Sequence, residues 1–117
     1  MNIAVVVTRL PLQGIAARES LDLIFALAAV DHQLSVVFAD DAVYQLLKAQ
    51  DSTATLTKDF RRSFKLFELY EIDNLYVCAE SLKQRNLKLD NLMLEVKPLE
   101  HTELSRLLHN QQHVIRA

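Results

Sequence analysis

Short apolar runs alternate with helical periodicity along the first part of the chain. The run Ile3–Thr8 is mostly β-branched and continuously apolar, which is typical of a strand covered on both faces. Leu34–Ala39 has the same character. Between these two runs, apolar residues recur at i, i+3, i+4 and i+7, namely Leu21, Ile24, Phe25 and Ala28. The pattern predicts a strand, an amphipathic helix ending at about Asp31, and a second strand.

Two further helices and a strand are predicted in the middle of the chain. Asp40 and Asp41 follow the second strand and offer carboxylates that can cap a helix. The inner face of that helix is expected to be Val43, Leu46 and Leu47. A third helix is predicted from Thr57 to about Tyr70, and Leu75–Ala79 is the third predicted strand.

The last part of the chain repeats the alternation. A short helix is predicted over Ser81–Arg85 and is closed by Asn86, which tolerates left-handed backbone conformation. Leu92–Val96 is the fourth predicted strand, and Pro98 is expected to open a helix. The inward residues of that helix are Leu104, Leu107 and Leu108. Val114–Ile115 is predicted to form a short fifth strand.

Five short strands alternating with helices predict an α/β fold. We expect a single domain over residues 1–117, with three layers around an open, mainly parallel five-stranded sheet of flavodoxin-like topology. Functional sites of such sheets form outside the carboxyl ends of the strands. The loops after Thr8, Ala39 and Cys78 are therefore the predicted location of any site.

Composition narrows the classes of function. The 117 residues include 13 basic and 15 acidic side chains, and this near balance favours neither a nucleic-acid nor a membrane partner. No apolar run reaches the ~20 residues of a membrane-spanning helix, and no signal-peptide pattern follows Met1. The single cysteine fits a reducing, cytoplasmic location. Gly14 is the only glycine, which excludes glycine-rich dinucleotide and P-loop sites.

Known sites of α/β sheets fit the chain poorly. A response regulator needs acidic residues after the first strand and an aspartate at the end of the third, where this chain has Arg9 and Cys78. A flavin mononucleotide site needs a hydroxyl- and glycine-rich loop, which is missing after Thr8. His109 and His113 are four positions apart, but His113 falls in the predicted last strand and no third metal ligand is near. We therefore expect no cofactor and no metal.

Two faces of the predicted third helix differ in character. One face is basic and is interpreted as solvated, because no aromatic residues are interleaved for stacking on bases. Its basic residues are Lys58, Arg61, Arg62 and Lys65. The other face is an apolar stripe wider than docking on a sheet requires. It includes Phe60, Phe64, Phe67, Leu66, Leu69 and Tyr70. Two interpretations remain open: a deeply buried helix, or a partner interface through Leu66, Leu69 and Tyr70.

Cys78 is the candidate thiol. It ends the third predicted strand next to a helix start, where backbone amides can stabilise a thiolate. Glu80 opposes such a thiolate, and no second cysteine can resolve a disulfide. We favour a structural or auxiliary thiol and keep a persulfide-carrying thiol as the alternative.

Several motifs resemble the TusC (DsrF) family of DsrE/F-like sulfur-relay proteins. They are Phe64–Asp73, Val77–Leu82, Arg85–Leu87, Arg18–Asp22, Val36–Asp41 and Gln45–Leu47. The resemblance covers nearly the whole chain. It departs from the family pattern at Ala42 and Asn86, where we expect glycine, and at Ala117, where we expect an aromatic residue.

The resemblance implies a subunit rather than an independent enzyme. Family members assemble with TusB-like and TusD-like sister subunits into a heterohexamer that passes persulfide sulfur toward 2-thiolation of the tRNA wobble uridine. A related DsrEFH complex serves sulfur oxidation. The carrier cysteine is assigned to the D-type subunit, so the resemblance implies an auxiliary role for this chain, with no catalytic residue of its own.

Overall fold

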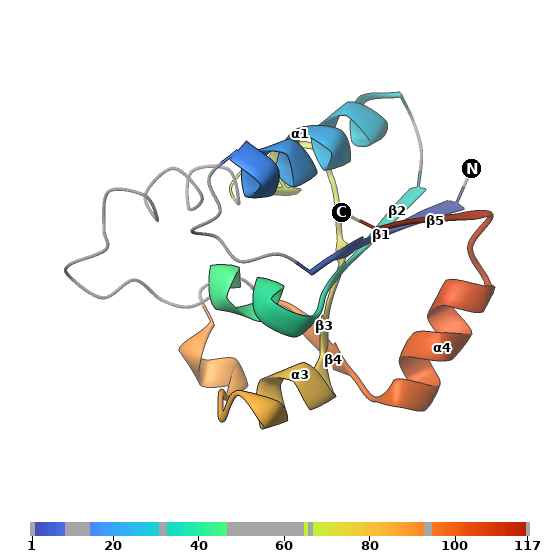
Figure 1. Cartoon of the computed structure of the whole chain (residues 1–117). Helices are drawn as coiled ribbons and strands as arrows, with labels where there is room; N and C mark the ends of the chain where they lie inside the picture. Colours follow the sequence, from blue (N-terminus) through green and yellow to red (C-terminus); the bar gives the residue numbers. More distant parts are fainter. Residues whose placement is uncertain are drawn as a thin grey trace.

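A five-stranded parallel sheet organises the molecule (Figure 1). The computed structural model describes residues 2–8, 15–30, 33–46, 65, 67–92 and 95–116. The strands are β1 (Asn2–Val7), β2 (Gln33–Phe38), β3 (Asn74–Cys78), β4 (Lys97–Leu99) and β5 (His113–Arg116). The helices are α1 (Ile15–Ala29), α3 (Ala79–Gln84) and α4 (His101–His109), with 3-10 helices η1 (Asp40–Leu46) and η2 (Leu89–Asn91). The α/β fold class predicted from the sequence is confirmed.

The strand order decides which face each helix covers. The order is β4-β3-β2-β1-β5, and so differs from the order 2-1-3-4-5 of flavodoxin-like sheets. The first three crossovers each step to the next neighbour in one direction, whereas the last returns across the whole sheet to β1. Because such crossovers are right-handed, a reversal of direction changes the face. Accordingly, α1 and α4 lie on opposite faces of the sheet (Figure 1).

The core lies mainly on the α1 face. Side chains alternate along each strand, and the register Val5↔Val36 places equivalent positions of β1 and β2 on the same face. The strand residues buried in this core are Ile3, Val5, Val7, Leu34, Val36, Phe38 and Val77. Ile24 of α1 and Phe67 join them, at 0% and 1% exposure. The predicted inner positions of α1 are thus confirmed at Ile24, and Phe25 and Ala28 pack at the edge of the cluster.

Two helix ends close with the same backbone motif. After the helical residues 67–69, the Ile72 N–H donates to the Phe67 carbonyl at 2.8 Å and the Glu71 N–H donates to the Glu68 carbonyl at 3.1 Å. These are the two bonds of a Schellman motif, which places Glu71 in the left-handed region at φ 57°. Asn86 occupies the equivalent position after α3 at φ 56°. The left-handed role predicted for Asn86 is confirmed, whereas that of Glu71 was not foreseen.

The predicted fourth strand was wrong. Residues 89–91 form η2, and the strand that pairs with β3 is Lys97–Leu99. Pro98, expected to open a helix, instead lies inside β4. A proline lacks the N–H that an inner strand needs, but β4 is an edge strand and tolerates it. The helix begins at His101, where Glu100 is the N-cap and forms a capping box with Glu103.

The second predicted helix is present as η1, a 3-10 helix. Val43 and Leu46 are fully buried, which confirms two residues of its predicted inner face. Leu47 and residues 57–64 of the predicted third helix lie outside the described residues. None of the helices in the described ranges is both long and apolar enough to cross a membrane.

Candidate functional site

The carboxyl ends of β2 and β3 meet at one edge of the sheet. The Ala39 N–H donates to the Val7 carbonyl at 2.9 Å, so the chain leaving β2 stays close to the end of β1. Cys78 ends β3 and is the N-cap residue of α3. Its side chain is half-buried and free of disulfide bonding. Cys78 is in register with Leu99 of β4, which is buried.

Ser81 connects the start of α3 to the segment that follows β2. The Asp40 N–H donates to the Ser81 Oγ at 2.9 Å, across 41 positions of sequence. Asp40 has a left-handed backbone, at φ 51°, and Ser81 is only 4% exposed. The serine hydroxyl thus satisfies a backbone donor in a strained turn, and the sequence motif containing Cys78 is fixed against the end of β2.

Arg85 ties α3 to η1. Its Nη2 and Nε both donate to the Asp41 Oδ1, at 2.9 and 3.3 Å, and its Nη1 donates to the Ser81 carbonyl at 3.3 Å. The guanidinium also lies 5.9 Å from the ring centroid of Tyr44. Asp41, expected to cap a helix, lies in the first turn of η1, and its carboxylate binds this arginine. No spacing pattern could reveal the pair, because 44 positions separate the two residues.

The described residues offer Cys78 little additional chemistry. They contain no group of three His, Cys, Asp or Glu side chains arranged to hold a metal ion. His109 ends α4 and His113 begins β5, so the two histidines belong to different elements. Both are exposed, as is His101, and His32 lies outside the described residues. Glu80, in the first turn of α3, adds a negative charge near the thiol.

A second candidate surface lies next to α1, at the end of the apolar stripe. Phe67 is buried, but Leu69 is 73% and Tyr70 41% exposed, so the end of the apolar stripe is not core in this chain. Phe25 contacts both aromatic rings: its centroid is 5.3 Å from that of Phe67 and 5.3 Å from that of Tyr70. Leu66, the third predicted interface residue, lies outside the described residues.

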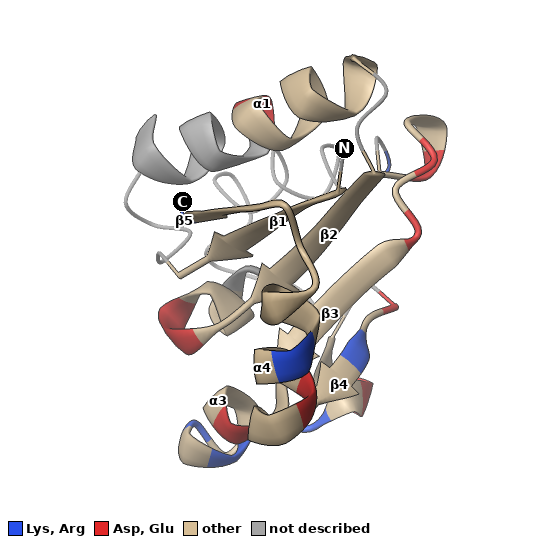
Figure 2. Ribbon diagram, turned by 90° about the vertical axis from the view of Figure 1, so that its right-hand side faces the viewer, with Lys and Arg blue, Asp and Glu red and all other residues tan. Residues whose placement is uncertain are grey.

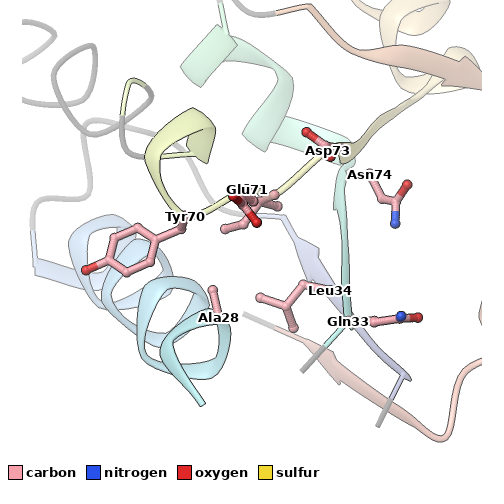
Figure 3. A pocket seen from close by; sticks show the side chains of 8 residues that line it. Ala28, Gln33, Leu34, Tyr70, Glu71, Asp73 and Asn74 are labelled. Atoms are coloured by element: carbon pink, nitrogen blue, oxygen red, sulfur yellow. The ribbon is translucent and has the colours of Figure 1, made fainter. Parts of the chain in front are cut away.

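A pocket of about 310 Å³ opens beside Tyr70, at the amino end of β2 and β3 (Figure 3). Its lining residues are Ala28, Gln33, Leu34, Tyr70, Glu71, Ile72, Asp73 and Asn74. Leu34 and Ile72 are buried apolar residues, whereas Glu71 and Asp73 are exposed carboxylates. The pocket could not be predicted from the sequence, because residues 28, 33–34 and 70–74 come together only in the folded chain.

The architecture and the sequence together define a class of protein. A sequence profile described as "DsrE/DsrF-like family" matches residues 1–117, and the chain belongs to that family. The crystal structure of the ychN protein from E. coli superposes with a TM-score of 0.82 and covers 100% of this chain and 99% of its own. At 18% identity, that similarity concerns the fold alone.

Closer sequence relatives are named more specifically. The chain is 41% identical over 100 residues to a protein named "Protein TusC homolog" from Vibrio vulnificus strain CMCP6. The match spans 86% of this chain and 85% of that protein. The protein of the same name from strain YJ016 matches equally well, with 41% identity over 100 residues. The resemblance read from the motifs is therefore confirmed at the level of the family.

Proposed function

We propose that this chain is an auxiliary, non-catalytic subunit of a sulfur relay of the TusBCD type. In this proposal, TusB-like and TusD-like sister subunits associate with it in the cytoplasm, and the complex passes persulfide sulfur toward 2-thiolation of the tRNA wobble uridine. The similarity to TusC homologs over most of the chain is the observation that carries the proposal. The chain itself acts through its contacts with the sister subunits and requires neither a cofactor nor a metal.

The surroundings of Cys78 support an auxiliary role. The chain contains no second cysteine to resolve a disulfide. Ser81 and Arg85 are occupied with binding Asp40 and Asp41, so they serve the local structure rather than the thiol. The side chains that follow Cys78 thus hold α3 against η1.

The exposed end of the apolar stripe supports association. Leu69 and Tyr70 expose apolar surface next to the aromatic contacts of Phe25. Residues at a protein interface are solvated in the separated chain and become buried only on assembly. We assign Leu69 and Tyr70 to the sister-subunit interface, together with Leu66, which precedes them in the same predicted helix.

The alternative function is sulfurtransfer by Cys78 itself. In that reaction the thiolate attacks the terminal sulfur of a donor persulfide, the donor S–S bond breaks, and the donor leaves as a thiolate. Cys78 then carries the persulfide, with no net oxidation. The partial exposure of Cys78 at the carboxyl edge favours this alternative. A subunit of a DsrEFH-type complex in sulfur oxidation would present the same thiol.

Complementation separates the two functions. Cells that lack this chain should lose 2-thiolated wobble uridine, measured by mass spectrometry of digested tRNA, and Cys78→Ser should restore most of it. Replacement of the carrier cysteine of the D-type subunit should abolish the modification in the same cells. Loss of thiolation in Cys78→Ser with an intact complex, and an adduct of one sulfur atom on Cys78 in the original chain, would establish the sulfurtransferase instead. Unchanged thiolation in cells lacking the chain would contradict the proposed pathway.

A further inference from the structure

The pocket beside Tyr70 has a mainly polar lining, with a small apolar part and two carboxylates at its opening. Ala28, Leu34 and Ile72 supply the apolar part, and Leu34 and Ile72 are each 5% exposed. Glu71 and Asp73 are exposed at the opening, and Figure 3 shows Glu71 between Tyr70 and Asp73. A long side chain with an apolar stem and a charged head matches this division, because the stem covers apolar surface while the head stays at the opening.

The charge of the surrounding segment is uniformly negative. Residues 67–74 include three carboxylates, Glu68, Glu71 and Asp73, and no basic side chain. Figure 2 shows the red of acidic residues along the segment that leads into β3. The described residues that line the pocket likewise include no lysine or arginine. A positively charged side chain complements this mouth, and a negatively charged one is repelled.

Tyr70 favours arginine over lysine. Its ring stacks on Phe25 at an interplanar angle of 25°, and the residue is still 41% exposed. An exposed aromatic face next to a carboxylate fits a guanidinium, which stacks on rings and bonds carboxylates through two parallel N–H groups. The volume of about 310 Å³ is at the lower end of the roughly 300–1,000 Å³ typical of ligand pockets, which suits one inserted side chain.

Glu71 is held at this mouth against its backbone preference. Its φ of 57° is a conformation that favours glycine, and glycine is the usual residue at this position of a Schellman motif. A glutamate here costs stability, yet it presents a carboxylate directly at the pocket. Strained residues of this kind concentrate at functional positions.

We infer that this pocket receives an arginine of a sister subunit, with Leu69 packing against apolar residues beside that arginine. The inference rests on the proposed function, since it names the chemistry of the partner at the Leu69–Tyr70 surface. The guanidinium stacks on Tyr70 and pairs with Glu71 or Asp73, while its methylene groups lie next to the small apolar part of the lining. The contact fixes the orientation of the subunit as well as adding affinity.

Neutral, nearly isosteric substitutions test the inference in the assembled complex. The test variant carries two substitutions, Glu71→Gln and Asp73→Asn. The control, Glu95→Gln, removes the charge of another exposed carboxylate. Each variant is mixed with the purified TusB-like and TusD-like sister subunits. Light scattering and calorimetry report assembly, and thermal unfolding reports folding. The dissociation constant of the double variant should rise roughly tenfold at unchanged stability, with the control unaffected. Its dependence on salt should also be weaker than that of the original chain.

Arginine-specific modification identifies the partner side chain. Phenylglyoxal treatment of the complex should leave one sister-subunit arginine protected by the original chain and reactive in the double variant. Normal assembly of the double variant, with the same protection pattern, overturns the inference and leaves the proposed complex intact. Failure of the original chain to bind either sister overturns both proposals. Charge-dependent self-association of this chain assigns the pocket to a second copy and also overturns the inference as stated.

Discussion

The two faces of the sheet are covered to different extents, mainly at the outer strands. On the α1 face, Val5 and Val36 are completely buried, and α1 contributes Ile24 to the same core. On the α4 face, Ala4 and Val37 of the central strands are completely buried as well, but Tyr76 of β3 is half-buried and Val114 of the edge strand β5 is 49% exposed. The helix that covers this second face has nine residues, none of them buried.

The difference follows from the strand order rather than from strand composition. Three crossovers step in one direction and place α1, η1 and α3 on one face, whereas the crossover through α4 returns over the other face. Hydrophobic stabilisation scales with the apolar area removed from water, so it is concentrated on the α1 face. Cys78 shares the α4 face with Tyr76 on β3, the strand next to the edge strand β4, and both residues are half-buried.

The largest contrast is expected between the helices of the two faces. Ile24→Ala in α1 removes a fully buried side chain and should lower the free energy of unfolding by about 3 kcal/mol. Leu107→Ala in α4 removes a half-buried side chain and should cost about 1 kcal/mol. Urea unfolding of both variants measures the two losses. Equal losses would show that α4 stabilises the sheet as much as α1 does.

Ser81 tests whether the carboxyl edge is held by its polar contacts. Ser81→Ala leaves the Asp40 N–H without its acceptor in a partly buried turn, at an expected cost of about 1–2 kcal/mol. Ser105→Ala, at an exposed position of α4, serves as the control and should be neutral or slightly stabilising. Thermal unfolding compares them. A neutral Ser81→Ala would mean that Arg85 alone holds α3 against η1.

The strands that sequence predicted well are those buried on both faces. Ile3–Thr8 and Leu34–Ala39 are continuous apolar runs, and they match β1 and β2 within one residue at each end. The prediction of the fourth strand failed because Leu92–Val96 is mainly apolar, whereas the observed edge strand β4 contains Pro98. A short edge strand needs few apolar residues, so composition signals it weakly.

The strand order and the contacts at the site could not be predicted from the sequence, because they are defined only in the folded chain. The same alternation of strands and helices is compatible with the order 2-1-3-4-5 and with the order observed, so the pattern predicts the class but not the topology. The sequence identified Cys78 and Tyr70 as candidates by their position and pattern. It could not reveal the bond between Arg85 and Asp41, or the left-handed Glu71 at the pocket, because both depend on tertiary contacts.

Substitution of Glu71, on the α1 side of the sheet, is expected to stabilise the fold. Glu71→Gly relieves the left-handed backbone at the end of the helix above the α1 face and should raise the free energy of unfolding by about 1 kcal/mol. Asn86→Gly, at the equivalent position of the second Schellman motif, should gain only a few tenths of a kcal/mol, because asparagine tolerates this conformation. Chemical denaturation measures both gains. Destabilisation by Glu71→Gly would indicate that the glutamate side chain contributes to folding.

The smallest effect on stability is expected at Leu69, where the effect on assembly should be large. Leu69 is 73% exposed, so Leu69→Ser should change the free energy of unfolding by no more than about 0.5 kcal/mol. Leu89→Ser is the matched control, since Leu89 is also exposed, at 44%, but lies in η2, away from the Tyr70 pocket lining. If the surface above the α1 face binds the sister subunits, Leu69→Ser weakens the complex in light scattering and Leu89→Ser does not. Equal assembly of both variants would move the interface elsewhere, and the half-covered α4 face around Tyr76 and Val114 would be the next surface to substitute.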